Sequence, residues 1–399
     1  MSLIQNKDEL TKENSELRRD ALAILEAGLE AVDTKKVLRQ KIMVKSGVLH
    51  INGTSFNLQS FNKIIFVGIG KCAFDGAKAI EDILGDKLTA GIALDVKAGE
   101  LKRIKTFVGT HPYPSEKNIL ATKEILEMVK GVTERDLVLV LISGGGSALF
   151  ELPIPGVDLN TIIEATKELT AKGADIYELN KVRKNLSQVK GGKFAEICSP
   201  AEVVSLIFSD VLGNDISVIA SGPTVLDTPN ARVKNILMVS NRDALLAMQQ
   251  RAKNLGYDTK IESESLSGNA TKVGEELARR RLEPKTCFLF GGETTVHKQG
   301  DGTGGRNQEL ALAGLSLVPE GSLLLAAASD GWDNTDTAGA IADKNFYEKS
   351  KALGLEVNDF LRRSDSYNFW KGVEGAICTG RLGSNVSDLI IMLSGNGKK

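Results

Sequence analysis

The sequence contains few of the residues that build metal sites and disulfide frameworks. Only three histidines occur, and their spacing matches no zinc motif (His50, His111 and His297). The four cysteines lie far apart, without a C-x-x-C pair, and each has apolar neighbours (Cys72, Cys198, Cys287 and Cys378). We therefore expect reduced cysteines in the core of a cytoplasmic protein, because disulfides are rare in reducing compartments.

Long apolar runs and an excess of one charge are also missing. No stretch approaches the ~20 apolar residues that a membrane-spanning helix requires, and the chain passes from Met1 to charged residues without the apolar segment of a signal peptide. Lys and Arg number 50 and Asp and Glu number 51, so the formal net charge is -1. This balance gives no reason to expect a nucleic acid or a membrane as a partner, and any anion is expected to bind locally.

The length and the pattern of apolar residues predict two domains of the α/β class. A chain of 399 residues exceeds one usual domain of ~100 to 200 residues. The composition becomes polar and includes a proline between Asp227 and Asn235, so we place the boundary there, with domains over residues 1–235 and 236–399. Short apolar runs predict strands over 63–67, 91–95, 136–142, 203–208, 286–290, 322–328 and 388–393.

Helical patterns lie between these runs. Residues 8–40 predict an amphipathic helix that breaks near Asp33 and Thr34, and residues 158–186 predict one long helix. Residues 44–58 predict a hairpin that turns at Asn52 and Gly53.

The stretch around which the chain is organised is the apolar run 136–142 and the loop that follows it. An uninterrupted run of this length is typical of a strand buried on both faces. The loop consists of Ser143, Gly144, Gly145, Gly146 and Ser147. Glycines at the carboxyl end of a strand let a phosphate or carboxylate approach the main chain, and a helix starting at Ser147 would direct its positive dipole end toward it. The alternative is an ordinary tight turn without a ligand.

A second glycine-rich turn follows the strand 63–67. The segment Gly68–Ala73 reads G-x-G-x-x-A, and Asp95 lies where a dinucleotide site needs its acidic residue. However, the turn contains Gly70 followed by Lys71. A lysine beside backbone amides suits a phosphoryl oxygen or a carboxylate better than a nicotinamide dinucleotide. The alternative for Lys71 is a solvated lysine at the start of a helix.

Cations and carboxylates at loop positions provide further candidates. Residues 180–193 combine several cations with glycines, which favours an anion site at Asn180, Arg183 and Lys190, although a solvated face is the usual explanation for such a run. Three carboxylates follow predicted strands and are candidates for a metal ligand or a base, namely Asp210, Glu293 and Asp330. Capping of the next turn is the alternative role for Asp210.

One more anion site is predicted before a helix in the second domain. Gly304 and Gly305 free the backbone, and Arg306 and Asn307 stand with a glutamine at the start of the helix. These side chains and the backbone amides would direct their donors toward one point. A plain loop is the alternative.

The motifs, taken together, resemble the glycerate 2-kinase family with its C-terminal MOFRL domain. Eight motifs occur in order from about Lys63 to the end of the chain, namely HPYP, LISGGGSALF, NKVRKNLSQVKGGKFA, SDVLGNDISVIASGPT, GGETTV, GGRNQELAL, SDGWDNTDTAGA and TGRLGSNVSDL. The resemblance implies an ATP-dependent kinase that converts D-glycerate to 2-phosphoglycerate. It also implies a Rossmann-like N-terminal domain, a smaller α/β MOFRL domain, an active site in an interdomain cleft, and active-site roles for Lys71 and Arg306.

The chain departs from the family pattern in two places. It has Asn185 where the family often has histidine, so a proton-transfer role at that position does not apply. It has Arg381 and Leu382 in the last glycine-rich loop, where the family commonly has proline and threonine, which puts the nucleotide contacts of that loop in doubt.

Phosphoryl transfer requires positioned cations, a divalent metal and a group that orients the attacking hydroxyl. We expect ATP and Mg²⁺ as cofactors and D-glycerate as substrate. Lys71 and Arg306 would stabilise charge, and the loop 143–147 with Arg306 would hold the glycerate carboxylate or the phosphoryl group. Asp210 would orient the C2 hydroxyl.

Two other functions compete with this hypothesis. A hydroxypyruvate reductase would use the G-x-G-x-x-A turn for NAD(P)H, and His111 would be its hydride-site partner, although a structural histidine is the simpler interpretation. A non-catalytic sensor would bind a sugar acid without turnover. The sequence is compatible with a homodimer but does not fix the oligomeric state.

Overall fold

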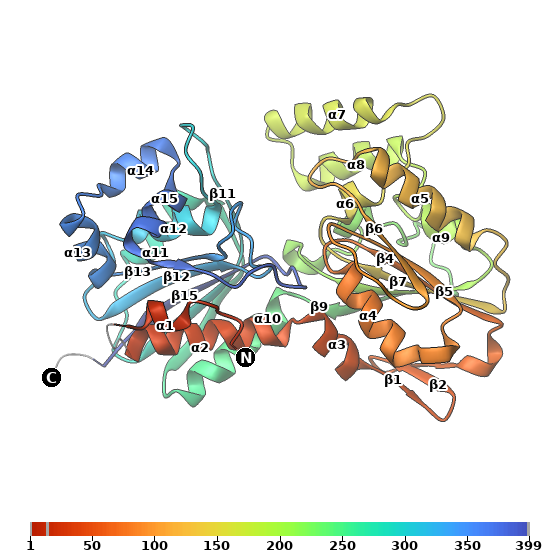
Figure 1. The fold of residues 1–399 in the computed structure, drawn as a ribbon, viewed down its shortest axis with the longest axis horizontal. Helices are drawn as coiled ribbons and strands as arrows, with labels where there is room; N and C mark the ends of the chain where they lie inside the picture. The colour runs from red at the N-terminus through yellow and green to blue at the C-terminus, as the bar shows by residue number, and fades with distance from the viewer. Residues whose placement is uncertain (1, 13–15, 397–399) are drawn as a thin grey trace. The chain divides into compact units, whose positions relative to one another are not determined.

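The chain forms two compact units in this computed structural model, which describes residues 2–12 and 16–396 (Figure 1). Unit 1 comprises Met1–Asp33, Asn241–Leu382 and Val386–Lys399, and unit 2 comprises Thr34–Ser240 and Gly383–Asn385. The units are therefore not two contiguous halves of the chain. The first residues belong with the C-terminal part, and three residues near the C-terminus belong with the N-terminal part.

Unit 2 contains the Rossmann-like sheet. Its helices and strands are α3 (Thr34–Lys41), β1 (Ile42–Lys45), β2 (Val48–Ile51), β3 (Thr54–Asn57), β4 (Lys63–Ile69), α4 (Ala73–Leu84), β5 (Ala90–Asp95), β6 (Ile104–Val108), α5 (Glu116–Val129), β7 (Asp136–Ile142), α6 (Gly146–Leu149), α7 (Leu159–Ala171), α8 (Ile176–Leu186), α9 (Lys193–Ile197), β8 (Glu202–Phe208) and β9 (Val233–Val239).

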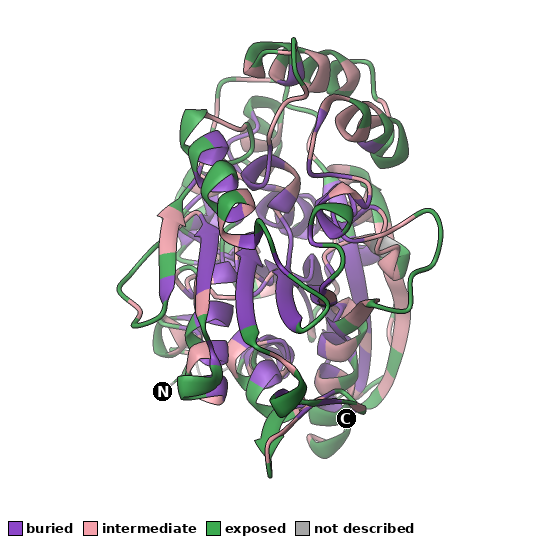
Figure 2. Cartoon of the chain, turned by 90° about the vertical axis from the view of Figure 1, so that its right-hand side faces the viewer, coloured by how far each residue is buried: buried purple, intermediate pink, exposed green. Residues whose placement is uncertain are grey.

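The six strands of this sheet are parallel and lie in the order β6-β5-β4-β7-β8-β9. Numbered along the chain, this is the doubly wound order 3-2-1-4-5-6, whose switch point lies between β4 and β7. Every residue of β7 is buried, as the uninterrupted apolar run predicts. The central strands are purple in Figure 2, which marks them as the core of the unit. The predicted Rossmann-like fold is confirmed.

One local prediction in unit 2 was wrong and another was incomplete. The segment expected as one helix over 158–186 is two helices, α7 and α8. The break comes at Gly173, whose φ is 75°, and α8 then starts with a capping box in which Asp175 accepts from the backbone N–H of Glu178. The hairpin predicted around Asn52 and Gly53 is present as β2 and β3, and a second turn at Ser46 and Gly47 adds β1 to make a three-stranded antiparallel sheet.

Unit 1 contains a mixed sheet. Its helices and strands are α1 (Lys7–Leu10), α2 (Glu16–Ala31), α10 (Asn241–Asn254), β10 (Asp258–Asn269), α11 (Ala270–Ala278), β11 (Thr286–Thr295), α12 (Arg306–Gly314), β12 (Ser322–Ala328), β13 (Gly339–Asp343), α13 (Lys344–Ala352), α14 (Val357–Arg363), α15 (Ser366–Val373), β14 (Ala376–Ile377) and β15 (Asp388–Ser394).

The order of its strands is β10-β11-β15-β12-β13-β14. Only β10 and β11 pair in parallel among the neighbouring strands described, and the other pairs are antiparallel. Helix α12 is buried from Asn307 to Gly314, so its N-terminus, at Arg306, is fixed by packing on the elements around it. The loops before α12, after β12 and before β15 carry most of the candidate residues of this unit.

The N-terminal helix α2 explains why the first residues belong to unit 1. Its apolar face is buried, including Leu22, Leu25 and Leu29. A Cβ at Gly28 would lie 2.6 Å from Cγ of Met248, so α2 and α10 approach closely at this glycine. The helix breaks before Thr34, as predicted. None of the helices in the described ranges is long and apolar enough to cross a membrane.

Candidate functional site

The loops after β4 and β7 meet at the switch point of the unit 2 sheet. The backbone N–H of Lys71 donates to the carbonyl oxygen of Gly144 at 2.9 Å, and the N–H of Cys72 donates to Oγ of Ser143 at 3.3 Å. Gly70 has a φ of 115°, and a Cβ there would lie 2.2 Å from Oγ of Ser143. Ser143 is itself buried. Gly70 and Ser143 therefore join the two loops, which places Lys71 beside the loop 143–147.

Three side chains surround the glycines of the loop 143–147. A Cβ at Gly144 would lie 1.9 Å from Oδ2 of Asp210, and a Cβ at Gly145 would lie 3.0 Å from Cγ of Lys71 and 3.3 Å from Cδ2 of His111. Larger residues in the loop would thus displace a carboxylate, a lysine and an imidazole. The structure brings together two of the three residues predicted as catalytic, Lys71 and Asp210, at this loop.

The surroundings of His111 show that the region is electropositive. Its pKa falls to about 4 because the surrounding protein desolvates the ring, and because Lys71 and Arg183 repel a positive charge there. The ring still reaches the surface, so the effect of the two cations is partly screened. A neutral imidazole beside two cations provides donors and positive charge for a small anion.

The loop 143–147 is held from one side by a chain of hydrogen bonds. Oγ of Ser147 and Oγ of Ser221 lie 3.0 Å apart, and Ser221 donates to Oδ1 of Asn180 at 2.7 Å. Nδ2 of Asn180 donates to the carbonyl oxygen of Val218 at 3.1 Å. Asn180 is buried, so it supports the loop through Ser221 rather than facing the surface where a ligand would enter.

Strained backbone accompanies this support. Ala220 and Ser221 have φ values of 51° and 62°, which side-chain-bearing residues rarely adopt, and both are buried. Such a conformation costs on the order of 1–3 kcal/mol and persists where the surroundings enforce it. The contact of Ser221 with Ser147 and Asn180 supplies that enforcement.

The predicted role of Lys190 as a phosphate ligand was wrong. Its side chain is 0% exposed, and Nζ donates to Oε2 of Glu151 at 2.6 Å and to the carbonyl oxygen of Phe150 at 2.7 Å. A buried ammonium group paired in this way is a counter-ion inside the fold. Arg183, by contrast, is only partly buried, and desolvation lowers its pKa.

The dipole expected at Ser147 is also smaller than predicted. Helix α6 has only four residues and begins at Gly146. A helix macrodipole needs several aligned turns, so α6 contributes little beyond its local amides. The positive potential at the loop 143–147 arises from side chains instead.

A nicotinamide dinucleotide site at the G-x-G-x-x-A turn would lack its acidic residue. Asp95 is 0% exposed and its carboxylate accepts from the backbone N–H groups of Phe74 and Val96 at 2.9 and 2.6 Å. Burial raises the pKa of Asp95 to about 6. This carboxylate caps the backbone inside the protein, so it is not available for the ribose of a nicotinamide dinucleotide.

In unit 1, the donors at the start of α12 do converge on one point, but that point is a side chain of the protein. Oδ1 of Asp333 accepts from the backbone and side-chain nitrogens of Asn307 at 3.2 Å, and Oδ2 accepts from the backbone N–H of Gln308 at 2.9 Å. A Cβ at Gly305 would lie 2.2 Å from Cγ of Asp333, and one at Gly304 would lie 2.1 Å from Oγ of Ser366. The donors of Asn307 are thus paired with Asp333, and phosphate binding at Gly304, Gly305 and Asn307 stays a prediction.

Arg306 is held by two carboxylates of the same unit. Nε and Nη2 donate to Asp388 at 2.6 and 3.0 Å, and Nη1 lies 2.8 Å from Oε1 of Glu293. Burial alone would lower the pKa of Arg306, but the charges of Asp388 and Glu293 raise it overall. The pKa of Asp333 rises to about 6, because it is buried and because Asp388 is negative.

The three predicted metal ligands do not form one site within a unit. Asp210 belongs to unit 2, where it accepts from Asn385, whereas Glu293 and Asp330 belong to unit 1. Glu293 pairs with Arg306, and Oδ1 of Asp330 accepts from the backbone N–H of Trp332 at 3.0 Å. Among the residues that the structure describes, no group of three or more histidine, cysteine or acidic side chains could hold a metal ion.

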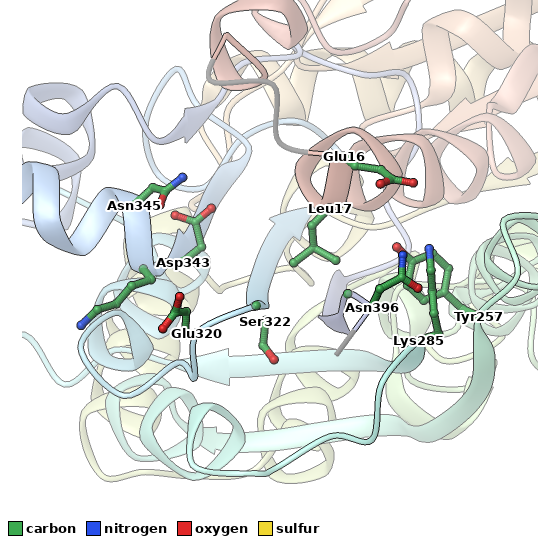
Figure 3. Close-up of a pocket in the computed structure, with 12 residues that line it drawn as sticks. Glu16, Leu17, Tyr257, Lys285, Glu320, Ser322, Asp343, Asn345 and Asn396 are labelled. Atoms are coloured by element: carbon green, nitrogen blue, oxygen red, sulfur yellow. The ribbon is translucent and has the colours of Figure 1, made fainter. Parts of the chain in front are cut away.

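A pocket of about 460 Å³ occurs at the other end of the unit 1 strands (Figure 3). It includes Ser322, the first residue of β12, and Asp343, the last residue of β13. The candidate residues Arg306 and Asp330 are not part of its lining. This pocket is separate from the chemistry predicted from the sequence.

Two family models match most of the chain. A profile described as a domain of unknown function (DUF4147) matches residues 20–255, and the MOFRL family matches residues 286–388. The D-glycerate 2-kinase of Thermotoga maritima is 36% identical, with 94% of this chain and 98% of that protein covered. The chain belongs to the glycerate 2-kinase family.

Relatives from other kingdoms and a solved structure extend this assignment. The human glycerate kinase is 32% identical over 93% of this chain and 92% of that protein. The crystal structure of the glycerate kinase of Thermotoga maritima is similar with a TM-score of 0.82 at 34% identity, covering 94% of this chain and 99% of that one. Because the family is shown, the predicted resemblance is confirmed.

Sequence reasoning missed three residues that contact the predicted site residues of the two units. Asn385 and Asp388 lie in and just after the last glycine-rich loop, and Asp333 lies in the segment SDGWDN. The sequence offered one signal for Asp333, a carboxylate shortly after a strand, which is the same signal that selected Asp330. Asn385 had no comparable signal, because its partner Asp210 is 175 residues away.

Proposed function

We propose that this chain transfers the γ-phosphoryl group of ATP to the C2 hydroxyl of D-glycerate, which gives 2-phospho-D-glycerate and ADP. The observation that carries the proposal is the set of side chains around the loop 143–147. Lys71, Arg183 and a neutral His111 provide positive charge and donors, and Asp210 provides a carboxylate beside Gly144. The similarity to proteins named D-glycerate 2-kinase and glycerate kinase supports the choice of substrate.

Each residue of this set has a distinct role in the proposed reaction. Lys71 and Arg183 bind the glycerate carboxylate or the transferred phosphoryl group, since both are anions. Asp210 accepts a hydrogen bond from the C2 hydroxyl and takes its proton as the hydroxyl oxygen bonds to the γ-phosphorus. The bond from the γ-phosphorus to the bridging oxygen breaks, and ADP leaves with that oxygen.

Arg306 is the proposed charge stabiliser of unit 1. Its Nη1 contacts Glu293, whose side chain is 48% exposed, while Nε and Nη2 contact Asp388, whose side chain is 2% exposed. We infer that a phosphate oxygen replaces Glu293 at Nη1 while Asp388 keeps the guanidinium in place. An arginine that exchanges one partner in this way stays oriented for the ligand.

The divalent metal is proposed to arrive with the nucleotide. Mg²⁺ is commonly held by phosphate oxygens and water with only one or two carboxylates from the protein. A single carboxylate such as Asp330 fits this arrangement, whereas no three-residue cage is present among the described residues. The ion would neutralise charge on the phosphates. A small-molecule substrate and a cytoplasmic location belong to the same proposal.

The test is an assay of the purified protein with D-glycerate, ATP and Mg²⁺. ADP release is followed, and the product is identified by ³¹P NMR. We expect 2-phosphoglycerate, and a loss of about 10²–10³-fold in kcat for Lys71→Met. Lys78→Met is the matched control, because Lys78 is an exposed lysine on the adjacent helix α4. NADH with hydroxypyruvate is run beside it, and NADH oxidation without phosphorylation would contradict the proposal.

A further inference from the structure

Three residues from the C-terminal part of the chain belong to unit 2. They are Gly383–Asn385, which we call the strap. The carbonyl oxygen of Gly383 accepts from Oγ1 of Thr34, and a Cβ on Gly383 would lie 2.2 Å from Oδ2 of Asp75. The strap therefore packs on α3 and α4, and a larger residue at position 383 would displace the carboxylate of Asp75.

The last residue of the strap contacts the proposed base. Nδ2 of Asn385 donates to Oδ2 of Asp210 at 3.4 Å. The glycine loop meets the same two groups, since a Cβ at Gly144 would lie 1.9 Å from Oδ2 of Asp210 and 2.9 Å from Nδ2 of Asn385. The amide, the carboxylate and the loop 143–147 thus converge on one point.

The chemistry of this contact bears on proton transfer. An amide donor forms a charge-assisted hydrogen bond with a carboxylate. It also restricts the rotation of the carboxylate, which matters because a misplacement of about 1 Å costs on the order of 100-fold in rate. Asp210 follows β8 in a loop, where the backbone alone fixes a side chain less firmly than it does in a strand.

We propose that Asn385 is a positioning residue of the phosphoryl transfer, which holds the Asp210 carboxylate oriented toward the C2 hydroxyl. This inference rests on the proposed function. It assigns to the last glycine-rich loop a role on the side of the sugar acid rather than at the nucleotide. The neighbouring Ser384 shares the strap but has a buried Oγ without a hydrogen-bond partner, so it has no such role.

The test compares Asn385→Ala and Asn385→Asp with Ser384→Ala as the matched control. For each variant, kcat and KM are measured as a function of pH, and thermal unfolding verifies the fold. We expect Asn385→Ala to lower kcat about 10-fold to 100-fold at each pH, with little change in the KM for D-glycerate, because a misplaced carboxylate slows the chemical step. Asn385→Asp lowers kcat at least as far, since a second carboxylate repels the first, and Ser384→Ala leaves kcat and KM unchanged.

A double-mutant cycle separates positioning from a general loss of structure. In the background Asp210→Asn, we expect Asn385→Ala to cause no further loss of kcat, because the group on which it acts is gone. Additive losses, or an unchanged kcat in Asn385→Ala, would overturn the inference and leave the kinase activity standing. A wild-type protein that forms no ADP with D-glycerate at any pH would instead overturn the proposed function and this inference with it.

Discussion

The buried pair of Lys190 and Glu151 gives a direct test of the structural interpretation of unit 2. The two side chains are 0% and 1% exposed, and Nζ lies 2.6 Å from Oε2. The perturbation is Lys190→Met, which keeps the length and the apolar stem of the side chain but removes its charge. Glu151 is then a buried carboxylate without its counter-ion.

The magnitude follows from desolvation. Removing one partner of a buried ion pair costs about 3–5 kcal/mol, because the remaining charge is uncompensated. The lost hydrogen bond to the carbonyl oxygen of Phe150 adds to this cost. Replacing both partners by uncharged residues of similar volume is often neutral, so Glu151→Gln combined with Lys190→Met should recover most of the loss.

The assay is equilibrium unfolding in urea, followed at the transition of unit 2, with kinase activity measured in parallel. We expect a lower midpoint for Lys190→Met, partial recovery in the double variant, and no change for Lys181→Met, a lysine exposed on α8. An unchanged midpoint together with a raised KM for ATP or D-glycerate would refute the reasoning. Lys190 would then contact the ligand, as its place in the charge run first indicated.

Two further predictions concern His111 in unit 2 and Glu293 in unit 1. The three histidines permit an NMR titration in which His111→Gln identifies the signal of His111. The pKa of His111 should lie below 6.5 and rise when 2-phosphoglycerate binds, so the affinity for this anion should increase as the pH falls toward the raised pKa. A titration midpoint near 6.5 that the ligand does not change would be inconsistent with the electropositive surroundings. Glu293→Gln should lower the KM for ATP a few-fold, because removal of the ion pair makes Nη1 of Arg306 accessible to phosphate. The variant should leave the free energy of unfolding nearly unchanged, because an exposed ion pair contributes only about 0–1 kcal/mol. A raised KM would indicate that Glu293 itself binds the nucleotide or its metal.

The sheet of unit 2 was predictable because its strands are recognisable in the sequence as short apolar runs. A parallel strand covered on both faces needs apolar residues at every position, and Asp136–Ile142 supplies them without interruption. The loop at its end was predictable for the same reason, since ligands of such sheets bind beyond the carboxyl ends of the strands. The sequence thus indicated both the fold and the edge of the sheet where the candidate site lies.

The partners of the charged residues were not predictable. Lys190 and Arg183 belong to one charge run, and nothing in the run distinguishes the lysine that pairs with Glu151 from the arginine near His111. The sequence shows that Asn307 can donate hydrogen bonds, but the acceptor, Asp333, lies in another loop. Tertiary contacts decide whether a donor serves a ligand or the protein, and a pattern of residue types contains no information on them.

The direction of two pKa shifts shows how the units differ as anion sites. In unit 2, Lys71 and Arg183 act with desolvation to lower the pKa of His111, so an anion would relieve repulsion there. In unit 1, Asp388 acts with burial to raise the pKa of Asp333, even though Arg306 opposes it. An added anion would meet carboxylates that already neutralise the arginine. We therefore propose that the glycerate carboxylate binds at the loop 143–147, and that Arg306 would serve a phosphate only by exchanging the exposed Glu293.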